Sequence, residues 1–137
     1  MKEPLSHHDA LIYTMVTMSA VDRTMTDAEL ARIGEIVSHL PIFANYNSDG
    51  LVNASQACGE LLGSDNGLQL VLDRIRSALP KKLHETAYAV ALEVAAADLN
   101  VQPEEMELLE LLSDTLELET LTKAAIERGI RARNMVL

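Results

Sequence analysis

Apolar residues recur every three to four positions along most of this chain, which is the spacing that places side chains on one face of an α-helix. No stretch of useful length shows the alternation typical of a β-strand. The pattern therefore predicts an all-α fold, a compact bundle of about seven helices. The expected helices cover about 7–21, 26 to just before Pro41, 51–62, 66–79, 81–97, a segment that begins at Pro103, and about 118–132.

Two of these helices have marked starts and apolar stripes. Thr26-Asp27-Ala28-Glu29 has the form of a capping box, in which the two outer side chains satisfy free backbone amides at a helix start. Pro103 suits the first turn of the sixth helix. The apolar stripes, expected to face the core, are Leu30, Ile33, Val37 and Leu40 in the second helix and Met106, Leu109 and Leu112 in the sixth.

The fifth predicted helix, 81–97, is apolar nearly all round beyond Thr86. A helix without a polar face is typically surrounded by others, so we expect it in the middle of the domain. The first helix should pair with it through Leu11, Met15 and Met18. The apolar stretch Ala87 to Ala97 contains Glu93 and is too short to span a bilayer.

The chain also contains an internal repeat. A shift of 76 positions, the difference between 98 and 22, places Asp22 on Asp98 and Glu29 on Glu105 without a gap. In both copies an apolar helix precedes the aspartate and an amphipathic helix follows it. We interpret the chain as one domain, residues 1–137, with a duplicated helix–acidic loop–helix unit at about 7–40 and 81–116.

The repeated acids are candidate metal ligands: Asp22, Glu29, Asp98 and Glu105, with weaker candidates Thr24, Asp27, Asn100 and Glu104. Each glutamate could instead serve only as a helix cap. Each aspartate is expected at the end of a helix, where negative charge is disfavoured and either loop amides or a bound cation would compensate it. Oxygen ligands suit calcium, magnesium or manganese. Only eight residues separate Asp22 from Glu29 inclusively, so the loop is not an EF-hand.

The two acidic loops could form one electronegative surface or two separate sites. If the first and fifth helices pack parallel or cross steeply, the loops come together. If they pack antiparallel, the loops lie about 20 Å or more apart. We expect the shared surface, because a cluster of like charges is retained where a cation or a basic partner uses it.

Composition narrows the function further. Hydrophobic residues form 48% of the 137 positions and aromatics only 3%, so the core is aliphatic. The net charge of -10 disfavours nucleic acids and anionic membranes as partners, and favours cations or a protein with a basic surface. The single Cys58 fits a reducing compartment, and no signal peptide begins the sequence, which predicts a cytoplasmic protein. A homodimer stays open.

The residues Ala95-Ala96-Ala97-Asp98-Leu99-Asn100-Val101-Gln102-Pro103-Glu104-Glu105 resemble the second acidic motif of TerB-like tellurite-resistance proteins, and Asp22 to Glu29 resemble the first. Arg23 and Leu99 depart from this pattern, because the family often has glycine there. The resemblance implies an all-helical, internally duplicated fold, an association with tellurite and stress responses, and metal sensing or binding within a larger assembly.

Three functions follow as hypotheses. The first is a non-catalytic module whose acidic loops bind a divalent cation or a basic partner. The second is an ion-independent helical adaptor. The third, a metal-dependent hydrolase, is least supported, because the sequence offers few convergent polar groups besides carboxylates. The pair His7-His8 with Asp9 is a weaker metal candidate, and Cys58 is expected to be a packed core residue.

Overall fold

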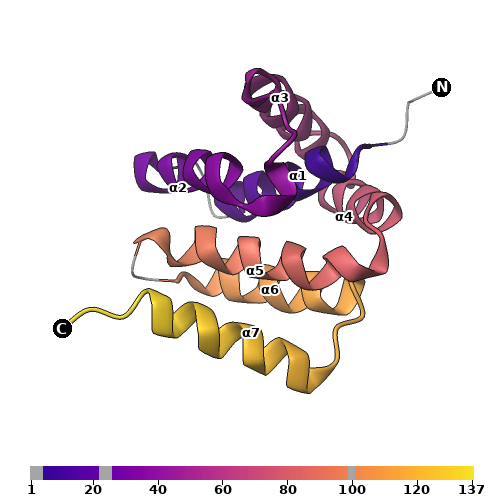
Figure 1. Ribbon diagram of the computed structural model, residues 1–137. Coiled ribbons are helices and arrows are strands. Elements are labelled where there is room, and N and C mark those ends of the chain that lie inside the picture. Colours follow the sequence, from indigo (N-terminus) through magenta and orange to yellow (C-terminus); the bar gives the residue numbers. More distant parts are fainter. Residues whose placement is uncertain (1–4, 22–25, 99–100) are drawn as a thin grey trace.

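The computed structural model describes residues 5–21, 26–98 and 101–137 (Figure 1). Within these ranges all regular structure is helical, which confirms the predicted all-α bundle of seven helices. The α-helices are α1 (His7–Ala20), α2 (Asp27–His39), α3 (Leu51–Leu62), α4 (Gly67–Ala78), α5 (His84–Ala95), α6 (Pro103–Thr115) and α7 (Thr120–Arg133). Short 3-10 helices are η1 (Pro41–Phe43), η2 (Ser48–Gly50), η3 (Lys81–Leu83) and η4 (Ala96–Asp98).

Local signals place most helix ends where the sequence predicted them. The capping box at the start of α2 is formed, with the Glu29 backbone amide donating to the Thr26 hydroxyl at 3.1 Å. The fifth helix differs from the prediction, because 81–97 is not one continuous α-helix. After Pro80 the chain first makes the tighter turn η3, in which the Leu83 amide donates to the Pro80 carbonyl oxygen at 2.9 Å. It tightens again into η4 at its far end.

The centre of the molecule is formed by α1 and α5. All residues of α1 from Ala10 to Ser19 are buried, and α1 packs against α3, α4 and α5. In turn, α5 packs against α1, α2, α6 and α7. The expected pairing of these two helices is therefore confirmed, with Leu11, Met15 and Met18 all in the core. Both helices run from right to left in Figure 1, so their carboxyl-terminal ends lie on the same side of the molecule.

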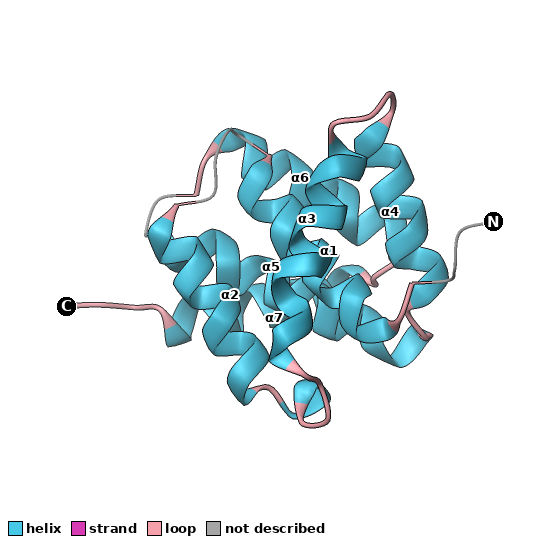
Figure 2. Ribbon diagram, turned by 90° about the horizontal axis from the view of Figure 1, so that it is seen from above, coloured by secondary structure: helices cyan, strands magenta, loops and turns pink. Residues whose placement is uncertain are grey.

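The remaining helices surround this pair. Seen from above in Figure 2, α2 lies on the left of α1 and α4 on its right. Figure 1 shows α3 above this row and α7 at the opposite side, below α5. No residue of α7 is buried, and its main packing partner is α5. No helix among the described residues is both long and apolar enough to cross a membrane.

The prediction that Leu30 and Met106 face the core is wrong, because both side chains are exposed. Leu30 is 55% exposed and Met106 is 59% exposed. The buried stripe of α2 consists of Glu29, Ile33 and Val37, which lie four residues apart, so Leu30 faces away from the core. In α6 the buried stripe likewise begins at Glu105 and leaves Met106 outside. The buried face of each helix therefore begins at the glutamate of its first turn.

Candidate functional site

Glu29 and Glu105 occupy matching places in the first turns of α2 and α6. Each residue is only 4% exposed. Oε1 of Glu29 accepts a hydrogen bond from the Thr26 amide at 3.0 Å, and Oε1 of Glu105 accepts one from the Gln102 amide at 2.9 Å. Both glutamates therefore cap their helices, which is the role that the sequence offered as the alternative to metal binding.

The other predicted ligands are only partly described. Asp22, Thr24 and Asn100 lie outside the described residues, as does the side chain of Asp98, whose backbone ends η4. Asp27 and Glu104 are exposed in the first turns of α2 and α6. A group of three or more His, Cys, Asp or Glu side chains placed to hold a metal ion does not occur among the described residues. The proposed ligand set thus stays a prediction.

The elements that carry the two acidic motifs lie near each other. The segment η4, which leads into the second motif, packs against α2, the helix that follows the first motif. The carboxyl-terminal ends of α1 and α5, which precede the two motifs, share one side of the molecule (Figure 1). This arrangement corresponds to the alternative in which the first and fifth helices run parallel or cross, rather than antiparallel.

Helix bounds and burial follow the register of the repeat. Adding 76 to the bounds of α2, 27 and 39, gives 103 and 115, which are the bounds of α6. At matching positions Glu29 and Glu105 are both buried, whereas Leu30 and Met106 are both exposed. These parallels agree with a duplicated unit. Duplication of the fold, with the two aspartates at equivalent helix ends, remains a prediction.

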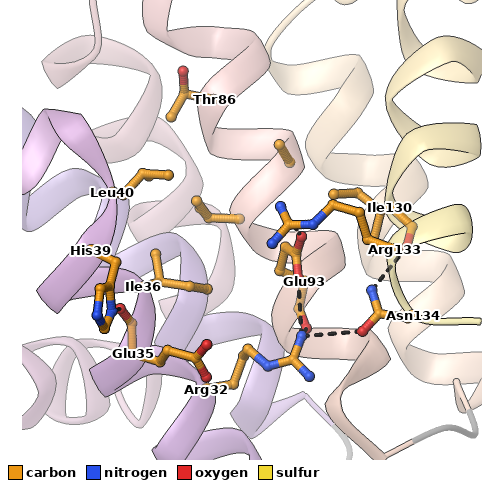
Figure 3. A pocket seen from close by; sticks show the side chains of 12 residues that line it. Arg32, Glu35, Ile36, His39, Leu40, Thr86, Glu93, Ile130, Arg133 and Asn134 are labelled. Atoms are coloured by element: carbon orange, nitrogen blue, oxygen red, sulfur yellow. Dashed lines mark hydrogen bonds and ion pairs between the residues drawn. The ribbon is translucent and has the colours of Figure 1, made fainter.

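A groove that the sequence did not indicate lies between α2, α5 and α7 (Figure 3). Its volume is about 590 Å³. The close-up shows α5 as the floor, with α2 and α7 as the two walls. It is lined by Arg32, Glu35, Ile36, His39, Leu40, Thr86, Ala89, Val90, Glu93, Ile130, Arg133 and Asn134.

A buried carboxylate lies between the two walls of this groove (Figure 3). Oε2 of Glu93 accepts from Nη1 of Arg32 at 3.0 Å, and Oε1 lies 2.9 Å from Nη1 of Arg133. The same Arg32 nitrogen is 3.3 Å from Oδ1 of Asn134. Glu93 on α5 therefore ties α2 and α7 to the central helix. In the sequence, this role was indicated only by the position of Glu93 as a single acid within an otherwise apolar stretch.

The remaining candidates have structural roles. Nε2 of His8 lies 2.7 Å from the Ile42 carbonyl oxygen, and its ring stacks on Phe43 with centroids 5.4 Å apart. This pairing anchors η1 to α1 and gives His8 a use other than metal binding. Cys58 is fully buried, as predicted, and burial raises the pKa of its thiol from 9.0 to about 11. A thiol in this state is a poor nucleophile at neutral pH.

Most of the chain matches a known protein family. A family model described as "Tellurite resistance protein TerB" matches residues 8–127, which is most of the chain and includes both acidic motifs. No curated protein matches the chain, and no solved structure matches it.

Proposed function

Because the chain belongs to the TerB family of tellurite-resistance proteins, we propose that it is a non-catalytic module of this system whose paired acidic loops bind a divalent cation. The cation would be calcium, magnesium or manganese, held by oxygens of Asp22, Glu29, Asp98 and Glu105. The alternative within the same proposal is a protein partner with a basic surface on these loops.

One observation carries this proposal: two glutamates, in the same register of two acidic motifs, are both buried at helix starts. Burying a carboxylate is costly unless hydrogen bonds or a positive charge compensate it. The helix dipoles and the capping bonds supply such compensation, and a cation at the same loops would add to it. The packing of η4 against α2 brings the second motif towards the first, so that one ion could draw ligands from both.

The complete capping interactions favour a second candidate, an ion-independent helical adaptor. In that case Glu29 and Glu105 serve only as caps, and the loops meet a partner through charge alone. Tellurite itself is an oxyanion that acidic loops repel, so any contribution to resistance would be indirect. Calorimetry with tellurite is expected to show no binding at the acidic loops.

The experiment that separates the two candidates is thermal unfolding of the purified chain with calcium, magnesium, manganese or zinc, each compared with a chelator. A cation that binds only the folded chain, and is present at a concentration 100 times its dissociation constant, adds about 2.7 kcal/mol to the free energy of unfolding. For a domain of this size, that raises the unfolding temperature by roughly 8 °C. No shift with any of the four ions would reject the cation site and leave the adaptor.

A further inference from the structure

We propose that the groove between α2, α5 and α7 binds an amphipathic helix of a partner protein, with aliphatic side chains on the α5 floor and an acidic side chain paired with Arg133. We call it the α2–α5–α7 groove. It is lined by none of the acidic-loop residues, so this site is separate from the one proposed above.

The floor and walls of the groove suit a ridge of aliphatic side chains. Thr86, Ala89 and Glu93 follow one face of α5, and the first two are only half-buried, so this face of a central helix is incompletely covered. Ile36 on α2, Leu40 just after α2, and Ile130 on α7 add apolar surface on both sides. The small side chain of Ala89 allows close approach. A groove of about 590 Å³ with such a lining can take the anchoring side chains of a helix.

The charges of the groove indicate how such a helix would be oriented. Two guanidinium groups, Arg32 and Arg133, face the carboxylate of Glu93, and Glu35 on α2 balances the second positive charge, so the charges are separated between the walls with the positive side on α7. The Arg133 side chain is 73% exposed and is therefore accessible to a ligand. Glu35 lies on the opposite wall, on α2 (Figure 3). A carboxylate of the ligand is thus expected on the α7 side.

Outside the groove, the rest of α7 is also basic. Within α7, Lys123, Arg128, Arg131 and Arg133 oppose the single acid Glu127, although the whole chain carries a net charge of -10. An acidic partner segment would be repelled by most of this protein and attracted here, which favours this groove over other surfaces.

The α7 wall also lies outside the part of the chain that the family model covers. The match ends at residue 127, whereas Ile130, Arg133 and Asn134 follow it. The groove is therefore built in part from residues that belong to this chain and not to the matched family segment.

A random library of 16-residue peptides displayed on phage, selected against the purified chain, tests the proposal. Selected peptides are expected to carry aliphatic residues at helical spacing and at least one acid. Their affinity, measured by fluorescence anisotropy, should fall about tenfold with Arg133→Gln, the loss of one charge-assisted contact. Ala89→Trp, which fills the floor, should abolish binding. Arg131→Gln, on the same helix but outside the groove, should change affinity less than twofold.

A charge exchange provides the sharpest control. Arg133→Glu should lose the peptide, and replacing the acid of the peptide by lysine should restore binding to that variant. Arg133 also pairs with Glu93, so hydrogen exchange of α7 in each Arg133 variant, compared with the parent chain, separates loss of the peptide contact from loss of the α7 wall. Basic or neutral selected peptides, insensitivity to Arg133, or no selected peptide at all would overturn the proposal. Two further results would overturn it: the groove binds the fatty acid decanoate but no peptide, or the chain self-associates in a way that depends on Arg133.

Discussion

At the scale of single residues, Gly67 is fixed by the backbone that surrounds it. A Cβ atom at this position would lie 2.4 Å from the carbonyl oxygens of both Leu61 and Leu62. The turn between α3 and α4 is this tight because Asn66, just before Gly67, adopts a left-handed conformation with φ of 56°. Only a residue without a side chain fits there.

We therefore expect Gly67→Ala to lower the free energy of unfolding by about 2 kcal/mol or more, because the end of α3 must shift. Gly34→Ala is the matched control: it lies within α2, and a Cβ there would meet nothing within 4 Å. That change should raise stability by up to about 1 kcal/mol through helix propensity. Urea unfolding measures both, and equal effects of the two substitutions would contradict this account.

The buried thiol of Cys58 is expected to make the free energy of unfolding decrease at alkaline pH. Burial raises the pKa of its thiol to about 11, above the usual 9.0, so the unfolded chain releases this proton first as pH rises. Stability is therefore full below pH 9 and falls as pH approaches 11, by about 2 to 3 kcal/mol. Comparison of unfolding at pH 8 and pH 10.5 with that of Cys58→Ala tests this. The variant should lose less stability over the same interval, and an identical loss would exclude the thiol as its source.

At the scale of elements, α7 is attached to its neighbours by side-chain hydrogen bonds and ion pairs, and none of its residues is buried. Tyr88 of α5 is fully buried, and its hydroxyl donates to Oε2 of Glu127 on α7 at 2.6 Å. Lys123 of α7 pairs with Glu110 of α6, and Arg133 pairs with Glu93. A helix attached in this way should open locally before the rest of the molecule unfolds.

We expect Tyr88→Phe to weaken the docking of α7 by about 1 to 2 kcal/mol, since it removes a hydrogen bond to a charged group. Hydrogen exchange should accelerate in α7 and stay unchanged in α3. Glu127→Gln, alone and combined with Tyr88→Phe, completes a double-mutant cycle. If the two effects add without coupling, the hydroxyl–carboxylate contact does not hold the helix.

At the scale of the whole molecule, the acidic motifs are expected to act together. Asp22→Asn and Asp98→Asn combined should raise stability without metal by about 0.3 to 1 kcal/mol for each site, because each removes a negative charge that the sequence predicts at a helix end. The same double variant should lose any cation-induced rise in unfolding temperature. Asp65→Asn, an exposed acid outside both motifs, serves as the control and should leave the cation response intact. A double variant with a full cation response would exclude both aspartates as ligands.

The sequence alone determined most elements of this protein, because the signals that form them are local, although it did not predict the 3-10 turns at the two ends of α5. Helical periodicity and turn residues placed α3 at Leu51–Leu62, as predicted, and the capping box at Thr26 marked the start of α2. The repeat pointed to Glu29 and Glu105, which the structure places in matching first turns. Family membership could likewise be recognised, since the acidic motifs are short and contiguous.

Only the tertiary structure decided which faces of the helices are covered. Leu30 and Met106 fit an apolar stripe equally well by periodicity, but the rotation of each helix depends on the neighbours it packs against. The α2–α5–α7 groove depends on Arg32, Glu93 and Arg133, which come from three helices far apart in sequence. No local pattern encodes such a meeting, because it arises from the way separate helices are packed together.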